Sequence, residues 1–185
     1  ILLNTPFKKV YVQAAAGDAG GAIGAAMTTW FKTGKEKSKN RLDLHEHAYW
    51  GPSFSNNYIE DLIEKKKKDL NLKDFKITFF SKLFDLTKDT ALEISKGKVI
   101  GWFQGRMEWG PRALGNRSIL GDPRRKNMKD ILNLKIKRRE SFRPFAPSIL
   151  SEHISDWFEQ KDDVPFMMQV YQILKDKRKK IPAVA

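Results

Sequence analysis

The sequence of 185 residues contains no cysteine. This absence excludes disulfide bridges and thiol catalysis, and it is typical of proteins from a reducing compartment. No apolar run approaches the roughly 20 residues that a membrane-crossing helix needs. No signal-peptide pattern opens the chain, whose first residue is Ile1 and not methionine. We therefore expect a piece of a longer, cytoplasmic protein that has no membrane partner.

Acidic residues are scarce relative to basic ones, because 22 Asp and Glu stand against 35 Lys and Arg, for a net charge of +13. Such a charge favours anionic partners, either nucleic acid or phosphate-bearing small molecules. Part of the excess lies in the lysine run at residues 65–68, which is typical of a solvated helix face and carries little functional weight. Since 41% of the residues are hydrophobic, we also expect a packed core.

The most specific stretch covers residues 101–124, where arginines alternate with glycines and prolines. Glycine permits tight turns and a close approach of backbone to a ligand. The guanidinium group offers a planar fork of five donors that suits phosphate and carboxylate oxygens. This pattern predicts an oxyanion pocket, and on these residues alone the alternative is an arginine-rich surface loop. The arginines of this stretch are Arg106, Arg112, Arg117 and Arg124.

A second cationic stretch covers residues 137–148, where Lys137, Arg139 and Arg143 alternate with aromatic residues and prolines. Near the start of the chain, small residues at 14–26 follow a short apolar run at 10–12, which predicts a strand, a glycine-rich turn and a helix. Asp18 lies where this helix begins. It is either a plain N-cap or part of a helix terminus that offers free amides to a phosphate.

Together, residues 12–26, 101–124 and 137–148 resemble the C-terminal part of bacterial O-carbamoyltransferases of the nodulation-protein and antibiotic-tailoring type. The resemblance implies an α/β fold: a YrdC-like twisted mixed sheet with flanking helices over residues 56–185, truncated at its C-terminus. A remnant of an actin/sugar-kinase-type ATPase domain, with a linker, would precede it over residues 1–55.

The resemblance also implies the chemistry. Carbamoyl phosphate and ATP with Mg²⁺ would give carbamoyl-adenylate, and the carbamoyl group would pass to a hydroxyl of a small-molecule acceptor. Arg112 would bind carbamoyl phosphate or carbamate, Lys137 the ATP phosphates, and Arg143 would complete the phosphate cluster. Further substrate-binding and ATP-binding roles would fall to Arg106, Arg117, Arg139 and Ser118.

In the first domain, the resemblance places the nucleotide loop at Gly17, Asp18 and Gly20. Asp18 would ligate a divalent metal, with iron as one candidate, beside the nucleotide. The two histidines that share this metal in the family lie upstream of this chain. His45 and His47 lie downstream and are interpreted as loop residues.

Local patterns give the expected elements. Apolar runs and alternation predict strands at residues 10–12, 75–80, 98–103, 148–150 and 166–171, with the strand at 98–103 central to the sheet. Capping signals predict helices that begin near Asp18, at Asn57 and at Thr87, the last ending at Gly97, and further helices at 127–134 and from Ser151 through Phe158.

Two other functions remain open from the residues. Basic runs beside aromatic residues also suit a nucleic-acid-binding α/β module without catalysis. A folded scaffold without activity of its own is the third possibility. Because the arginines gather in two glycine- and proline-shaped motifs and not along one stripe, we favour the enzyme and expect no nucleic-acid partner.

Overall fold

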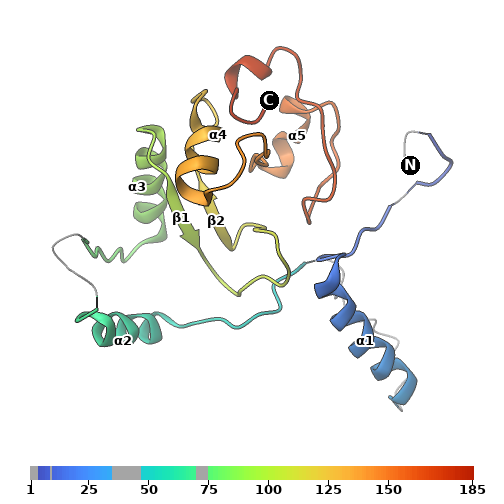
Figure 1. Ribbon diagram of the computed structural model, residues 1–185, viewed down its shortest axis with the longest axis horizontal. Helices are drawn as coiled ribbons and strands as arrows, with labels where there is room; N and C mark the ends of the chain where they lie inside the picture. Colours follow the sequence, from blue (N-terminus) through green and yellow to red (C-terminus); the bar gives the residue numbers. More distant parts are fainter. Residues whose placement is uncertain (1–3, 9, 35–46, 70–74) are drawn as a thin grey trace.

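A computed structural model describes residues 4–8, 10–34, 47–69 and 75–185 of the chain. Helices surround a small sheet in its main body, while α1 and α2 extend away from it (Figure 1). The expected α/β class is therefore confirmed at this coarse level. The elements in order are α1 (Asp18–Thr33), α2 (Asn56–Lys66), α3 (Leu83–Ser95), β1 (Ile100–Phe103), β2 (Arg117–Leu120), α4 (Met128–Asp130), the π-helical η1 (Ile131–Lys137), η2 (Ser151–His153), α5 (Ile154–Trp157) and η3 (Arg178–Lys180).

The sheet of the described residues has two antiparallel strands, β1 and β2. Ile100 faces Leu120 and Phe103 faces Arg117, so the segment between the strands leaves and re-enters the sheet at one end. The strand predicted at 98–103 is confirmed as β1, but it is not central, because it has one partner. The sequence analysis predicted no strand at the position of β2.

Four other predicted strands are wrong. Residues 10–12, 75–80, 148–150 and 166–171 have no strand assignment. At 75–80 the alternating Phe75, Ile77 and Phe79 are all exposed and pair with no strand of the described chain. Alternation indicates a strand only where a neighbour completes the hydrogen-bond ladder. Beyond residue 166, the described pairing is a single bridge between Phe158 and Ile173.

Most predicted helices form, with corrected starts. The N-cap of α1 is Gly17, and Asp18 is the first helical residue, so Asp18 is not a plain N-cap. Ser55, not Asn57, caps α2, because its side chain accepts a hydrogen bond from the Tyr58 amide. Lys82 holds the N-cap position of α3.

The predicted cap of α3, Thr87, lies inside that helix and donates its hydroxyl to the Phe84 carbonyl at 3.0 Å. The predicted end at Gly97 is confirmed. Its φ of 90° lies in the left-handed region that favours glycine, and its amide bonds the Ile94 carbonyl at 2.8 Å. The helix predicted at 127–134 corresponds to α4 and η1. The helix predicted to begin at Ser151 corresponds to the short η2 and α5.

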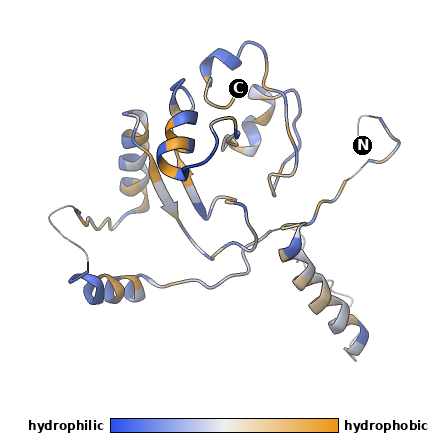
Figure 2. Ribbon diagram, viewed as in Figure 1, coloured by the Kyte–Doolittle hydropathy of each residue, from blue (hydrophilic) through white to orange (hydrophobic). Residues whose placement is uncertain are grey.

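The core consists of three small clusters. Met128 and Leu132, as predicted, face inward and pack with Ala183, Val99 and Phe145. Figure 2 shows the corresponding alternation of hydrophobic and hydrophilic positions along α4. A second cluster holds the C-terminal segment. Its buried members are Ile154, Phe158, Ile173 and Ile181.

The third cluster joins segments far apart in the sequence. Ala14, Ala48 and Phe166 are its buried members, and Trp50 and Leu114 pack against them.

In the described part of the chain, no helix is both long and apolar enough to cross a bilayer.

A matched pair on η1 tests the first cluster. Leu132 is 5% exposed and Leu134 is 56% exposed. Leu132→Ala should therefore lower the free energy of unfolding by about 2–5 kcal/mol, because it leaves a cavity. Leu134→Ala should change it by less than about 0.5 kcal/mol. Urea unfolding followed by circular dichroism measures both. Equal losses in the two variants would refute this packing.

Candidate functional site

The connection between β1 and β2, residues 104–116, is here called the arginine loop. Its first half pairs with residues 48–52 in the manner of an antiparallel strand. The Gly51 amide bonds the Met107 carbonyl at 2.9 Å, the Met107 amide bonds the Pro52 carbonyl at 2.9 Å, and the Trp109 amide bonds the Ala48 carbonyl at 2.7 Å. A segment more than fifty positions earlier therefore fixes the path of the loop.

The tip of the arginine loop rests on the turn that precedes α1. Gly110 has a φ of 98°, and a Cβ added to it would lie 2.6 Å from the Ala15 Cβ. Ala15 itself has a positive φ of 55°. The Trp109 indole N–H donates to the Ala19 carbonyl in the first turn of α1 at 3.1 Å. These contacts place the tip beside the turn that leads into the predicted nucleotide loop.

The predicted nucleotide-loop residues lie at the start of α1. Gly20 is buried, and its amide bonds the Ala15 carbonyl at 2.8 Å. Gly17 and Asp18 are exposed. Asp18 is the only predicted metal ligand in the chain, and the described residues contain no group of three or more His, Cys, Asp or Glu side chains that could hold a metal. The donors present do not by themselves fit a metal site. His47 stacks on Tyr49, and His45 lies outside the described residues.

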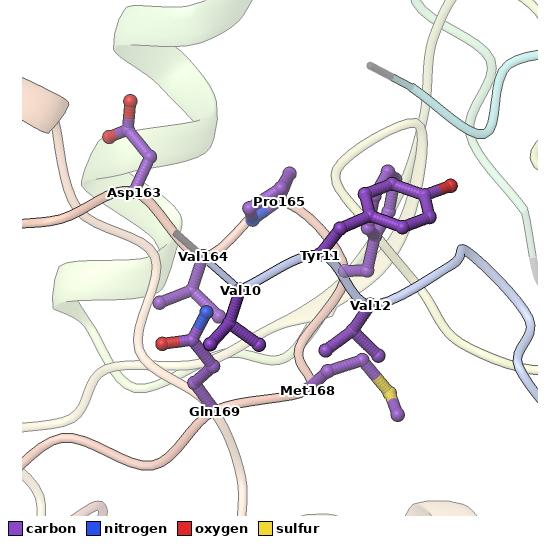
Figure 3. A pocket seen from close by; sticks show the side chains of 9 residues that line it. Val10, Tyr11, Val12, Asp163, Val164, Pro165, Met168 and Gln169 are labelled. Atoms are coloured by element: carbon purple, nitrogen blue, oxygen red, sulfur yellow. The ribbon is translucent and has the colours of Figure 1, made fainter. Parts of the chain in front are cut away.

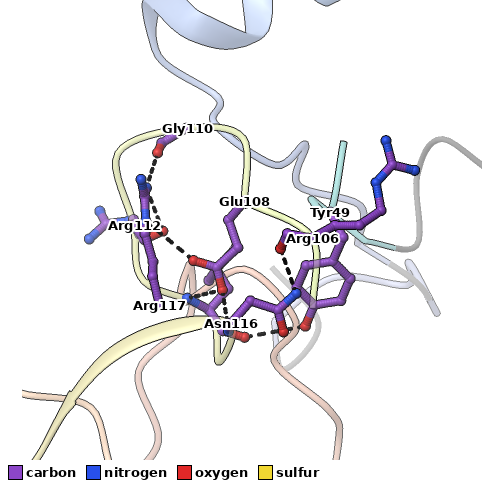
Figure 4. Close-up of polar contacts among 8 residues, drawn as sticks. Tyr49, Arg106, Glu108, Gly110, Arg112, Asn116 and Arg117 are labelled. Atoms are coloured by element: carbon purple, nitrogen blue, oxygen red, sulfur yellow. Dashed lines mark hydrogen bonds and ion pairs between the residues drawn. The ribbon is translucent and has the colours of Figure 1, made fainter. Parts of the chain in front are cut away.

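A buried carboxylate organises the inside of the arginine loop. The Glu108 side chain has an exposed fraction of 0%, and its Oε2 lies 3.3 Å from the Arg117 Nε. Its Oε1 accepts the Leu114 amide at 2.9 Å and the Asn116 amide at 2.7 Å. Figure 4 shows these contacts converging on Glu108. From the sequence, Glu108 was expected at most as an ion-pair partner of a neighbouring arginine, and the pair with Arg117 confirms that possibility. Its bonds to two backbone amides of the loop were not foreseen.

Two of the predicted substrate-binding arginines of this loop region are bonded internally. The Arg117 guanidinium donates to the Gly110 carbonyl and, at 3.1 Å, to the Arg112 carbonyl. The Arg106 guanidinium donates to the Gly51 carbonyl at 2.9 Å and to the Trp50 carbonyl at 3.2 Å. Both side chains therefore fasten the loop to neighbouring backbone.

Arg124 is also bonded internally, to Asp122. Its Nε and one terminal nitrogen contact the two carboxylate oxygens, the latter at 2.7 Å. This guanidinium lowers the pKa of the Asp122 carboxyl below its usual range, against the opposing effect of burial. Arg112 differs from all three arginines. Its side chain is exposed and forms no hydrogen bond or ion pair with the described residues.

Ser118 lies in β2 opposite Trp102, half-buried in the sheet. Its position follows the end of the arginine loop, because β2 begins at Arg117.

The second cationic loop, residues 137–143, depends on the fully buried Asn133, which is 0% exposed. The Asn133 amide group donates to the Ser141 carbonyl at 3.1 Å and to the Arg143 carbonyl at 2.9 Å. Its Oδ1 accepts the Arg139 Nε at 2.7 Å. Sequence reasoning missed Asn133, and only its place among apolar helix positions could have indicated it.

The three predicted cations of this second loop also differ in whether their side chains are bonded within the chain or are exposed. Arg139 is bound to Asn133 and lies over the Phe145 ring, 4.8 Å from its centroid. Arg143 is exposed and meets Glu140 at 3.9 Å, a surface ion pair of little strength. The Lys137 side chain is exposed and has no hydrogen bond or ion pair among the described residues.

Each of the two cationic loops, residues 104–117 and residues 137–143, has its own network of hydrogen bonds and ion pairs. No hydrogen bond or ion pair between described residues joins the Glu108 network to the Asn133 network. The convergence of Arg112, Lys137 and Arg143 on one cleft therefore stays a prediction.

A hollow of about 300 Å³ lies elsewhere, between residues 10–12 and 163–169 (Figure 3). Its lining is largely apolar, with Val10, Val12, Val164 and Met168 among its side chains. None of the predicted site residues lines it, so we do not assign phosphate chemistry to it.

Comparison with known proteins gives one family. Residues 91–185 match the family described as Carbamoyltransferase C-terminus. The chain is 40% identical to nodulation protein NolO of Bradyrhizobium diazoefficiens, an alignment that covers 100% of this chain and 32% of the relative. It is 40% identical to nodulation protein NolNO of Sinorhizobium fredii, covering 100% of this chain and 26% of the relative.

A further relative is an uncharacterized protein of Synechocystis sp., 43% identical over 96% of this chain and 28% of the relative. The chain thus spans about a third or less of the length of these curated relatives.

A pair of glycine variants tests the docking of the loop tip. Gly110 and Gly115 both have positive φ, but a Cβ at Gly115 meets nothing within 4 Å. Each change to alanine should cost about 1–2 kcal/mol of backbone strain. Only Gly110→Ala should lose about 1–3 kcal/mol more, through the clash with Ala15. It should also speed solvent exchange of the Trp109 indole proton, measured by NMR. The same exchange rate in both variants would contradict the contact.

Proposed function

The chain belongs to the carbamoyltransferase family through its C-terminal region, residues 91–185, and from this premise we propose that it takes part in O-carbamoyl transfer through carbamoyl-adenylate. Carbamoyl phosphate and water give carbamate and phosphate. Carbamate oxygen then attacks the α-phosphorus of ATP and releases pyrophosphate. Finally, a hydroxyl oxygen of a small-molecule acceptor attacks the carbamoyl carbon, releasing AMP as the hydroxyl proton leaves. The relatives named as nodulation proteins support carbamoyl chemistry in general.

One observation carries the proposal at residue level: the cations divide into two groups. Arg106, Arg117, Arg124 and Arg139 are bonded to carbonyl or side-chain oxygens of the chain itself. Arg112 and Lys137 have no internal partner among the described residues, and Arg143 has only a long exposed contact. These last three residues are the ones to which the resemblance gives the main substrate roles. The further roles that it gives to Arg106, Arg117 and Arg139 fall on side chains that are bonded within the chain.

The chemistry explains the need for free cations. Carbamoyl phosphate and ATP are both anions, and they must lie side by side before one attacks the other. Phosphoryl and nucleotidyl transfers depend mainly on positioning and on neutralising charge that develops on oxygen. Arg112 would bind the carbamoyl phosphate, Lys137 would bind the ATP phosphates, and Arg143 would complete the phosphate cluster. Mg²⁺ would arrive with ATP as part of the substrate.

The finer fold assignment is part of the same proposal. We place the adenylate-forming site on a YrdC-like domain at residues 56–185, and we assign residues 1–55 to the end of an ATPase-type domain. The contact of Gly110 with Ala15 supports a close relation of the two parts, because the turn before α1 packs directly on the arginine loop.

Alanine substitutions test the three assignments. Arg112→Ala, Lys137→Ala and Arg143→Ala should each lower the rate of pyrophosphate release from MgATP and carbamoyl phosphate by about 10²–10³-fold, the usual cost of one charge-stabilising donor. Lys135→Ala is the control, since Lys135 is an exposed cation of the same helix η1. In the 185-residue chain, calorimetric binding of each substrate provides the second measurement. Normal rates and affinities in all three variants would overturn the assignment.

A binding comparison separates the enzyme from a nucleic-acid-binding module. The melting temperature of the chain should rise with MgATP and with carbamoyl phosphate, because both bind the folded state. Single-stranded oligonucleotides at equal phosphate concentration should not reproduce this rise. Tight oligonucleotide binding that weakens steeply with salt, together with no effect of ATP, would favour the module instead.

A further inference from the structure

The arginine loop contains an unexpected charge. Glu108 is a carboxylate with 0% side-chain exposure, placed within a stretch for which we propose anion binding. A buried carboxylate is costly unless it is paired and hydrogen-bonded. Its negative charge would also repel any phosphate nearby, so charge alone gives no reason for its position.

The contacts of Glu108 supply a geometric reason. Its Oε1 holds the amides of Leu114 and Asn116, on the returning side of the loop. Its Oε2 lies 3.3 Å from Nε of Arg117. This is an ion-pair contact and not a hydrogen bond, because Oε2 is buried without a hydrogen-bond partner among the described residues. It draws the planar Arg117 guanidinium toward the inside of the loop.

Arg117 passes this orientation to the loop tip. Its terminal nitrogen donates to the carbonyls of Gly110 and Arg112, one on either side of Pro111. The backbone of Arg112 is thus held from inside the loop, while the Arg112 side chain is exposed and unbonded. Figure 4 shows the sequence of contacts from Glu108 through Arg117 to the backbone at Arg112.

We propose that Glu108 is a positioning residue, which acts through Arg117 to hold Arg112 in the orientation that binds a phosphate-bearing anion. The identity of that anion as carbamoyl phosphate rests on the proposed function, but the positioning itself requires only that Arg112 binds a phosphate group. A loop backbone held in its bound geometry loses less conformational entropy when the ligand arrives, so the side chain that it carries binds the ligand more tightly.

The sign of one mutational effect separates positioning from electrostatics. Glu108→Gln keeps the size of the side chain and an acceptor for the two amides, but it removes the negative charge. If Glu108 acted only by its charge, this change would strengthen anion binding, because it removes a repulsive group. If Glu108 positions Arg112, the same change should weaken binding about tenfold, within the coupling range of contacting residues.

The experiment is a double-mutant cycle with the 185-residue chain. Calorimetry gives the dissociation constants of inorganic phosphate and carbamoyl phosphate for the wild type, Glu108→Gln, Arg112→Ala and the double variant. We expect Glu108→Gln alone to weaken carbamoyl phosphate binding about tenfold. In the Arg112→Ala background it should have no further effect on the dissociation constant. Unchanged or tighter binding, or an equal loss with and without Arg112, would overturn the proposal.

A second variant keeps the test decisive if Glu108→Gln fails to fold. Arg117→Lys retains a positive charge but loses the fork that reaches both carbonyls, at a side chain that is 38% exposed. It should weaken carbamoyl phosphate binding by a similar factor, and again only when Arg112 is present. A loss that persists without Arg112 would make Arg117 a direct ligand contact and would overturn the relay.

The outcomes also separate this proposal from the proposed function. Suppose that the effect of Glu108→Gln on inorganic phosphate binding depends on Arg112, but that the chain binds carbamoyl phosphate no more tightly than inorganic phosphate. The positioning proposal then stands and the substrate assignment fails. If Arg112→Ala leaves the affinity for both anions unchanged, the positioning proposal itself fails.

Discussion

The internal bonding of guanidinium groups determines which donors of the two cationic loops stay open to a ligand. An arginine side chain carries five N–H donors and no acceptor, so its donors bond to oxygen atoms of the protein, of solvent or of a ligand. Arg106 and Arg117 find them on backbone carbonyls, Arg124 on Asp122, and Arg139 on Asn133. These bonds shape the two cationic loops. They also reduce the number of guanidinium donors that these loops leave open to a ligand.

One glycine of the motif, Gly110, and one outside it, Gly51, have a comparable structural role. Gly110 allows the loop tip to contact Ala15, and Gly51 allows residues 48–52 to approach the loop, because a Cβ there would lie 2.6 Å from the Met107 Cβ. The sequence-based argument took the glycines as a sign of close approach between backbone and ligand. At Gly110, as at Gly51, the close approach is between segments of the protein. The consequence for the chain is a fixed backbone path on either side of Arg112.

Local signals predicted the parts of the fold that depend on local energetics. The helix from Asp18, the stop at Gly97 and the strand that delivers the arginine loop follow from capping, backbone conformation and apolar runs. The strand predicted at 75–80 failed because alternation contains no information about a partner. The division of the cations was equally inaccessible, since the acceptors of Arg106 are the carbonyls of Trp50 and Gly51, 56 and 55 positions away. Backbone carbonyls have no signature in a sequence.

The same division bears on the choice between an enzyme and a nucleic-acid-binding surface. A net charge of +13 suits both functions, and so do exposed lysines such as those on α2. A polyphosphate backbone can be held by flexible cations, because its charges repeat and tolerate many arrangements. It gives no reason to bury a carboxylate inside an arginine loop, or to devote a fully buried asparagine to the backbone of a second loop. Such costs are justified where a few cations must meet a small anion in one geometry. Glu108 and Asn133, which carry no positive charge, are therefore the residues of these loops that weigh most in favour of an enzyme.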